Sequence, residues 1–479
     1  MQPSTRRAFL KTLGAGTAAL ALPRSTRLQA APAGAAASRP NILLILADDM
    51  GFSDIGCFGG DARTPNIDRL ASGGLRFSQF YNGARCCPTR ASLLTGLYAH
   101  EAGVAAMTNG AGDVNPPGPY EGYLNRNCVT IAEVLRDAGY ATLMSGKWHI
   151  GESRPHWPTD RGFDHYYGLI SGAANYFDIT RGKSPATIRR FALDDQPIVP
   201  PHENWYMTDA ITDNAVRQLT ESFAGGKPFF QYVAYTAPHY PLMALPEDIA
   251  RYRGRFMDGW DVMRDRRYRR LLDMGIIDPS CRLTPRDPAV SPWAGLNAKQ
   301  RDEQDLRMAI YCAQIDRMDQ GIGKILATLE RAGKADDTLV LFLSDNGGNA
   351  EGGIAGIDYR HNGVPPGGVD SYMSYGQSWA NASNTPFRLY KRWVHEGGIS
   401  TPLIARWPGR IAANGKITDQ VGHIIDLMAT CCDVAGARYP AERAGHTIKP
   451  LRGTSLLPIL QGGTRTAPDA LFWEHFSNR

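Results

Sequence analysis

Short apolar runs recur along the chain, and each is followed by polar or charged residues. Residues 41–47 (NILLILA) form one such run, directly before Asp48 and Asp49. Further runs lie at residues 141–144 (ATLM), 229–235 (FFQYVAY), 339–343 (LVLFL) and 403–405 (LIA). Continuous apolar runs of this length are typical of strands buried on both faces of a parallel sheet. Ligands bind at the carboxyl ends of such strands, so the polar residues after each run are candidate site residues.

Helix signals lie between these strands. Thr64 and Pro65 are residue types that favour an N-cap and a first helical turn. Residues 130–133 have the spacing of a capping box, and the helix that they open should end near Gly139. An apolar stripe predicts an amphipathic helix that ends near Gly333, through Ile315, Met318, Ile322, Ile325 and Leu329. The alternation of strands and helices predicts an α/β fold with a large sheet and a site along one edge.

The first 38 residues have the pattern of an export signal. Arg6 and Arg7 form a twin arginine, and residues 12–22 are a short apolar stretch of mostly small residues. That stretch is too short to span a bilayer permanently, and no other stretch resembles a membrane helix. A disordered basic tail is the alternative, but it does not explain the apolar stretch. We therefore expect a twin-arginine signal peptide at 1–38, export by the Tat machinery, a periplasmic or secreted bacterial protein, and no stable membrane insertion.

The basic net charge comes from this leader. The 479-residue chain has a formal net charge of +5, and the leader holds five basic residues and no acid, so the rest is close to neutral. The sequence therefore gives no reason to expect a nucleic-acid partner. Residues 251–270 are dense in arginine but interleaved with Asp and aromatic residues, which predicts a solvated surface helix.

Eight cysteines occur, and none forms a Cys-x-x-Cys pair of the metal-binding type. Cys312 and the pair Cys431 and Cys432 lie in apolar, helix-like surroundings, which favours packing roles. Cys86 differs, because Arg85 and Arg90 flank it and a helix is predicted to start just after it. Both features lower the pKa of a thiol and make it reactive. A buried structural cysteine is the alternative.

Two sets of polar residues follow the predicted strands and the Cys86 segment. Asp48, Asp49, Asp345 and Asn346 offer the hard oxygen ligands that Ca²⁺ and Mg²⁺ prefer. The second set supplies the cationic and hydrogen-bonding groups that an oxyanion substrate requires; its members are Arg90, Lys147, His149, His239 and Lys391.

The segment from Cys86 to Gly96 resembles a known family signature. Its Cys-x-Pro-x-Arg pattern followed by Leu-Leu-Thr-Gly is similar to that of type I, formylglycine-dependent sulfatases of the alkaline phosphatase superfamily. Other segments match in the same order, at residues 40–49, 64–68, 146–151, 162–164, 237–239, 344–347 and 396–398. Within the family the chain looks most like bacterial arylsulfatases, through residues 259–261, 379–381, 385–388 and Lys391.

The resemblance implies a fold, a cofactor and residue roles. It implies a large mixed, mostly parallel sheet flanked by helices, and a formylglycine made from Cys86 by a formylglycine-generating enzyme. One divalent cation, Ca²⁺ or alternatively Mg²⁺, would be held by Asp48, Asp49, modified Cys86, Asp345 and Asn346. Arg90 and Lys147 would steady the formylglycine. His239 and Lys391 would bind sulfate and protonate the leaving oxygen, and His149 would take a proton from the aldehyde hydrate.

The sequence departs from the family pattern at two places. Position 89 is Thr where Ser is commoner. Residues 470–475 look like the first strand of the family's C-terminal antiparallel subdomain, but the chain stops at Arg479. We therefore expect a catalytic domain at 39–465 and an incomplete subdomain that starts at 466–479.

These observations favour a sulfuric ester hydrolase of the arylsulfatase type, acting on a small-molecule or carbohydrate sulfate ester. Two alternatives remain. A phosphonate or phosphate ester hydrolase of the same superfamily can share the metal site and the formylglycine. A non-catalytic protein that binds sulfated glycans would result if Cys86 stayed a thiol.

Overall fold

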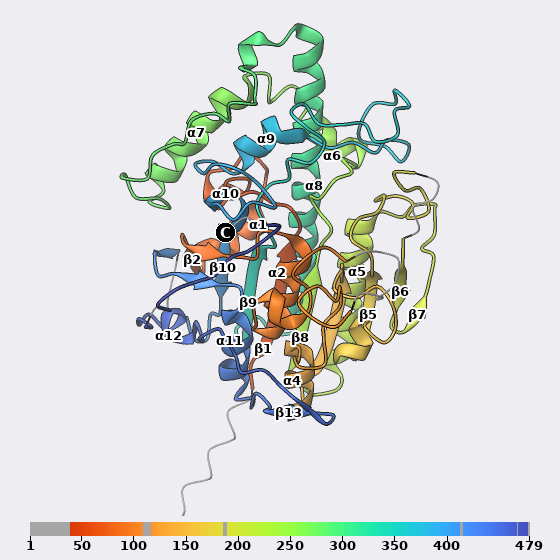
Figure 1. Ribbon diagram of the computed structural model, residues 1–479, viewed down its shortest axis with the longest axis vertical. Coiled ribbons are helices and arrows are strands. Elements are labelled where there is room, and N and C mark those ends of the chain that lie inside the picture. The colour runs from red at the N-terminus through yellow and green to blue at the C-terminus, as the bar shows by residue number, and fades with distance from the viewer. Residues whose placement is uncertain (1–38, 109–115, 185–188, 412–414, 467, 478–479) are drawn as a thin grey trace, which may run out of the picture. The chain divides into compact units, whose positions relative to one another are not determined.

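A ten-stranded sheet crosses the protein in the computed structural model (Figure 1), with the strand order β11-β2-β10-β9-β1-β8-β4-β5-β6-β7. The structure describes residues 39–108, 116–184, 189–411, 415–466 and 468–477. The predicted signal peptide at 1–38 lies outside these described residues. Residues Arg39–Arg479 form one compact unit.

The centre of the sheet is parallel and its flanks are mixed. Five strands run parallel, namely β9 (Thr338–Ser344), β1 (Asn41–Ala47), β8 (Phe229–Ala234), β4 (Ala141–Gly146) and β5 (His165–Leu169). On one side β10 (Leu403–Arg406) is antiparallel to both β9 and β2 (Leu75–Phe77), and β11 (Lys416–Thr418) pairs in parallel with β2. On the other side β6 (Phe191–Leu193) and β7 (Gln196–Pro197) are antiparallel. The predicted mixed, mostly parallel sheet is confirmed.

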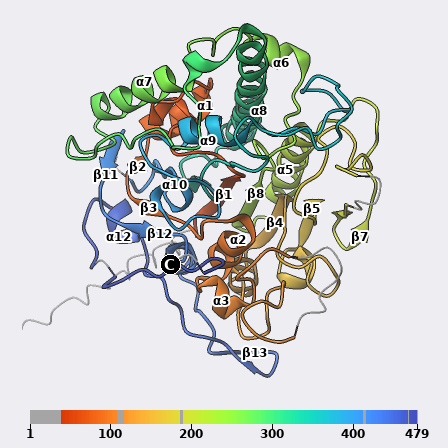
Figure 2. The same ribbon diagram turned by 45° about the horizontal axis from the view of Figure 1, so that its top comes forward.

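Apolar helices cover both faces of the sheet. Along β1, Leu43 and Ile45 pack into the cluster with α1 (Pro65–Ser72), α5 (Met207–Phe223) and α8 (Ala298–Arg331). The alternate residues Ile42 and Leu44 pack into the cluster with α2 (Cys86–Thr95), α4 (Ile131–Asp137) and α11 (Asp426–Ala435). Figure 2 shows α1, α5 and α8 on one side of the central strands and α2 on the other. Burial on both faces is the reason that the strand sequences are continuously apolar.

The remaining elements are short or peripheral. The helices are α3 (Ala99–Ala102), α6 (Pro246–Ala250), α7 (Gly259–Asp273), α9 (Gly376–Ser383), α10 (Glu396–Ile399) and α12 (Leu457–Leu460). Strand β3 (Phe80–Tyr81) pairs with β12 (Gly422–His423), and β13 (Glu442–Arg443) forms a small antiparallel hairpin with β14 (His446–Thr447). No helix among the described residues has the length and apolar character needed to cross a membrane.

The two predicted helix starts have different outcomes. The capping box of α4 is confirmed, because the Glu133 N–H donates to Thr130 Oγ1 at 3.0 Å and the Thr130 N–H donates to Glu133 Oε2 at 2.7 Å. Thr64 is the N-cap residue of α1 and Pro65 its first residue, as predicted, but the Thr64 hydroxyl caps no helical N–H and accepts instead from the Gly56 N–H at 2.8 Å. The Asp319 carboxylate of α8 takes the capping role, and the Ile67 N–H donates to it at 2.8 Å.

The predicted solvated helix at 251–270 is only partly solvated. Helix α7 buries Arg267 completely, and its guanidinium lies 2.8 Å from Asp54 Oδ1 and 2.8 Å from Asp61 Oδ2. Two carboxylates from the loops after β1 compensate the buried charge of Arg267. The density of arginines in the sequence therefore did not predict which face of α7 is buried.

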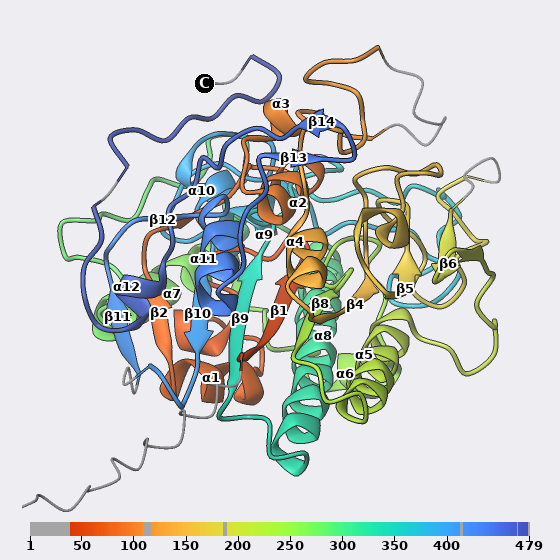
Figure 3. The same ribbon diagram turned by 90° about the horizontal axis from the view of Figure 1, so that it is seen from below.

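All eight cysteines are free thiols, and Cys312, Cys431 and Cys432 are buried as predicted. The expected strand at 470–475 is not formed within described residues 468–477, where His475 makes only a single bridge. Side chains hold this segment instead, because Trp473 Nε1 donates to the Asn82 carbonyl at 2.8 Å and Glu474 lies 2.7 Å from His100 of α3. Figure 3 shows the last described segment of the chain passing near α3.

Candidate active site

The candidate site lies where the central parallel strands end. Ala47 of β1 is in register with Ser344 of β9, and Gly146 of β4 is in register with Ala234 of β8. The residues that follow these strands therefore emerge at one edge of the sheet. These are Asp48 and Asp49 after β1, Asp345 and Asn346 after β9, Lys147 and His149 after β4, and His239 after β8.

Four oxygen-bearing side chains gather at this edge, all of them at most 1% exposed. They are Asp48, Asp49, Asp345 and Asn346. Oδ1 of Asp48 and Oδ1 of Asn346 have no hydrogen-bond partner among the described residues. A buried oxygen without a donor is costly unless a cation satisfies it. Hard oxygen donors of this kind fit Ca²⁺ or Mg²⁺, so the residues present fit a divalent cation.

Cationic side chains surround these carboxylates. Lys147 Nζ lies 2.5 Å from Asp48 Oδ2, and Arg90 Nη2 lies 2.9 Å from Asp345 Oδ2. Burial raises the pKa of Asp48 and raises that of Asp345 still further. Burial also opposes ionisation of Asp49, but His239 and Lys391 overcome it and hold the pKa of Asp49 below its usual value. The carboxylates therefore need further positive charge to be ionised together.

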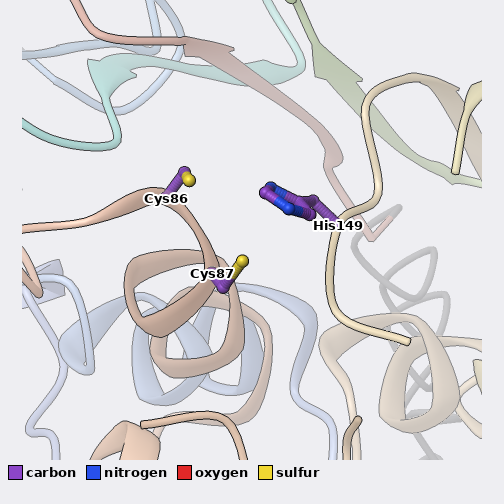
Figure 4. A group of neighbouring side chains, drawn as sticks. All are labelled: Cys86, Cys87 and His149. Carbon is purple, nitrogen blue, oxygen red and sulfur yellow. The ribbon is translucent and has the colours of Figure 1, made fainter. Parts of the chain in front are cut away.

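Cys86 lies at the first position of α2, with Arg85 as the N-cap, one residue earlier than the sequence predicted. The thiol is fully buried. A hydrogen bond from the Cys87 thiol and the charge of Lys147 hold its pKa well below the usual value, against the effect of burial. Cys86, Cys87 and His149 bring their donor atoms within 4.8 Å of one another (Figure 4).

His149 is held in an unusual backbone conformation against a glycine. Its φ is 59°, and burial lowers the pKa of its imidazole to about 4. A Cβ atom on Gly172 would lie 2.3 Å from Cε1 of this ring. Only glycine at position 172 leaves enough space for the His149 ring. Residues held in a strained backbone conformation, as His149 is, are common at functional sites.

His239 and Lys391 form a second pair beside Asp49. Lys391 Nζ lies 3.2 Å from His239 Nε2 and 2.9 Å from Asp49 Oδ1. His239 Nδ1 lies 2.6 Å from the Tyr240 carbonyl, which can only accept, so Nδ1 carries the proton. Burial lowers the pKa of His239 to about 4, so Nε2 of the neutral ring faces the Lys391 ammonium.

The structure thus brings all ten predicted site residues to one place, and it adds two that the sequence analysis missed. Asn349 Nδ2 donates to Asp49 Oδ2 at 2.8 Å. Glu351 lies 3.5 Å from Arg85, and the charge of Lys391 outweighs burial to hold the pKa of Glu351 below its usual value. The sequence feature that could have identified Asn349 and Glu351 is their position, because both lie within six residues of Asp345.

The sheet topology and this edge site define a member of the alkaline phosphatase superfamily. The crystal structure of Ps i-CgsB in complex with k-i-k-neocarrahexaose is similar, with a TM-score of 0.63, 27% identity, and coverage of 89% of this chain and 77% of that one.

Residues 40–437 match the family model described as Sulfatase, and the chain belongs to the sulfatase family. It is 34% identical over 433 residues to an arylsulfatase of Klebsiella aerogenes, which covers 88% of this chain and 92% of that protein. It is 33% identical over 478 residues to an uncharacterized sulfatase of Schizosaccharomyces pombe, with coverage of 93% and 84%. The chain is therefore an enzyme of the sulfatase class, a hydrolase of sulfate esters.

Proposed function

We propose that the enzyme cleaves a sulfate monoester with a formylglycine at position 86 and one divalent cation bound by Asp48, Asp49, Asp345, Asn346 and the modified residue 86. The observation that carries the proposal is the pair of buried oxygens, Asp48 Oδ1 and Asn346 Oδ1, which lack a partner among the described residues. A cation there, Ca²⁺ or Mg²⁺, would orient a sulfate oxygen and lower the pKa of a hydroxyl bound to it. A formylglycine hydrate would supply a nucleophile with a second hydroxyl.

The basic residues at the sheet edge have separate tasks in this proposal. The Arg90 guanidinium donates from Nη2 to Asp345 Oδ2, and it donates from Nη1 to the Lys147 carbonyl at 2.9 Å. It therefore fixes the backbone from which Lys147 extends. The Lys147 ammonium, held by Asp48, faces the side chain at position 86 and stabilises negative charge there.

Two histidines handle protons. Both are neutral at pH 7, because burial lowers the pKa of each to about 4. Neutral His149, whose ring makes a side-chain hydrogen bond with Cys86, accepts a proton from the side chain at position 86. Lys391 is an ammonium held between Asp49 and His239, and the pair binds the sulfate group and delivers a proton to the leaving oxygen.

We further propose that the substrate is an aryl or carbohydrate sulfate, in line with the arylsulfatase relative and with the carbohydrate in the Ps i-CgsB crystal structure. The domain organisation proposed with it is a twin-arginine signal at 1–38 and a catalytic domain at 39–465. Export through the Tat machinery and modification by a formylglycine-generating enzyme complete the proposal.

Peptide mass spectrometry combined with turnover tests this function. The peptide containing position 86 should weigh about 18 Da less than the cysteine form, since a thiol is replaced by an aldehyde oxygen. The purified enzyme should hydrolyse an aryl sulfate faster than the matching aryl phosphonate or phosphodiester, and Cys86→Ala should abolish this. Full activity with an unmodified Cys86 contradicts the mechanism, and a preference for phosphorus esters contradicts the substrate class.

A further inference from the structure

Soft donor atoms gather around Cys86. Cys86 Sγ lies 3.6 Å from Met107 Sδ, and Cys87 Sγ lies 3.7 Å from the same sulfur. The donor atoms of Cys86, Cys87 and His149 all lie within 4.8 Å of one another. Figure 4 shows the two cysteines on the first turn of α2, with the His149 ring reaching toward them from the segment after β4.

These distances fit one small ion. In a tetrahedral site with metal–sulfur bonds of about 2.3 Å, neighbouring sulfurs are about 3.8 Å apart. The two sulfur distances to Met107 are within 0.2 Å of that edge. His149 is only 3% exposed, and its Nδ1 has no partner among the described residues. Met107 Sδ thus lies near both thiols, and both thiols lie near the buried His149 imidazole, so these side chains are close enough to one another to bind one small ion.

We propose that the chain with an unconverted Cys86 binds one Cu⁺ ion through Cys86, Cys87, Met107 and His149. Thiolate and thioether sulfur select a soft cation, and the thioether favours Cu⁺ over Zn²⁺. Binding replaces the thiol protons of Cys86 and Cys87, which pass to the buffer, and copper remains Cu⁺ throughout. This metal site is separate from sulfate ester hydrolysis and does not depend on it.

The site changes character when position 86 is modified. Conversion of Cys86 to formylglycine removes one of the three sulfurs and puts an oxygen group in its place. Position 86 then belongs to the hard oxygen donors of Asp48, Asp49, Asp345 and Asn346 and no longer to the soft site. Cys87 thus acquires a role that the hydrolytic mechanism does not use: together with the thiol at position 86 it binds copper in the unconverted chain, and the mature enzyme lacks that second thiol.

Competition for Cu⁺ tests the site. Full-length chain produced without the converting enzyme, with the thiol at 86 verified by mass, is titrated with Cu⁺ in ascorbate against bicinchoninate absorbance. One Cu⁺ per chain should resist the competitor. Loss of an outer partner of a metal ligand already costs about 10- to 100-fold in affinity, so Cys87→Ala and Cys86→Ser should each weaken binding at least about 100-fold. Met107→Leu should weaken Cu⁺ binding but leave Zn²⁺ affinity unchanged.

The chain offers a matched control. Cys431 and Cys432 are also adjacent and buried on a helix, and Cys432 Sγ lies 3.9 Å from Met428 Sδ. No third cysteine, histidine or acid completes a metal-binding group there within the described part of the chain. Cys432→Ala should therefore leave Cu⁺ affinity unchanged. X-ray absorption should show a copper–sulfur shell with one nitrogen.

Three results overturn the proposal. They are failure to hold Cu⁺ against the competitor, equal loss in Cys432→Ala and Cys87→Ala, and a copper shell of nitrogen and oxygen only. Unchanged Cu⁺ affinity in Met107→Leu overturns the assignment of the thioether. Because the readout is copper binding, none of these outcomes bears on whether the enzyme cleaves sulfate esters.

Discussion

The Nζ atom of Lys391 lies 2.9 Å from Oδ1 of Asp49, although the two residues are 342 positions apart in the sequence. Both side chains are almost completely buried. The same ammonium lies 3.2 Å from His239 Nε2, so one buried cation balances a carboxylate and orients an imidazole. This relationship joins the proposed cation site to the proposed proton donor.

Replacing Lys391 should therefore impair catalysis. We expect Lys391→Met to lower kcat on an aryl sulfate by about 10²- to 10⁴-fold, the range for loss of a general acid. The exposed Lys227 is the matched control, and Lys227→Met should keep full activity. Near-normal turnover by Lys391→Met, with folding verified by circular dichroism, would remove this residue from the mechanism.

Removal of the divalent cation should both inactivate and destabilise the enzyme, because buried carboxylates lose their counter-charge. Dialysis against a chelator is expected to abolish aryl sulfate hydrolysis and to lower the thermal unfolding midpoint. A cation at 100 times its Kd contributes about 2.7 kcal/mol to the stability of the state that binds it. Titration of Ca²⁺ and Mg²⁺ back into the sample should restore both properties, and Asn346→Ala should require more cation. An enzyme that stays active after complete metal removal, measured by elemental analysis, contradicts the proposed site.

The contact between Gly172 and His149 predicts an effect at a residue that bears no chemistry. A Cβ at position 172 would lie 2.3 Å from the imidazole, so Gly172→Ala should displace His149 and lower activity at least about 10-fold. Gly295 is the control, because a Cβ there meets nothing within 4 Å. In a double-mutant cycle, Gly172→Ala should add little to the loss caused by His149→Ala. Additive losses would show that Gly172 acts by another route.

Arg267 should be among the costliest arginines to remove. Arg267→Ala leaves Asp54 and Asp61 buried without their partner, and breaking a buried ion pair in this way costs about 3–5 kcal/mol. Arg269 lies two positions away on the same helix but is exposed, so Arg269→Ala should change stability by less than about 0.5 kcal/mol. Urea unfolding of both variants measures the contrast. Similar losses of unfolding free energy in the two variants would mean that the buried ion pairs of Arg267 do not stabilise the fold more than the exposed pair of Arg269 does.

His423 predicts a pH dependence of stability outside the active site. Burial, reinforced by Arg465, lowers its folded-state pKa to about 3, whereas an unfolded histidine has a pKa of about 6.5. Below pH 6.5 the unfolded chain therefore binds a proton that the folded chain does not. The contribution of His423 to the stability of the folded protein is therefore complete above pH 6.5 and is lost as the pH falls toward 3.

A variant isolates this contribution. At about 1.4 kcal/mol per pH unit, the wild type should lose about 2 kcal/mol more than His423→Gln between pH 7 and pH 5. Glutamine keeps an acceptor for the Ile425 N–H, which donates to His423 Nδ1 at 3.3 Å. Urea unfolding at the two pH values measures the difference, and equal acid sensitivity of both proteins contradicts the assignment.

The amino-acid sequence by itself determined the five apolar strands β1, β4, β8, β9 and β10, the α4 capping box and the set of candidate residues that the fold brings together. Local rules carry this information: a strand buried on both faces must be apolar throughout, and a capping box needs two residues at fixed spacing. Parallel strands end at one edge, so residues that follow them, such as Asp48 and Asp345, could be grouped before any contact was known.

Only the tertiary structure decided the contacts between distant parts of the chain. The side chain that caps α1 is Asp319, which lies 252 residues from Ile67. The buried Arg267 pairs with Asp54, which lies 213 residues away. Gly172 beside His149 and Met107 beside Cys86 likewise depend on loops that local propensity does not position. Such contacts result from packing, since the free energy that selects them depends on which surfaces meet after the sheet and its helices have formed.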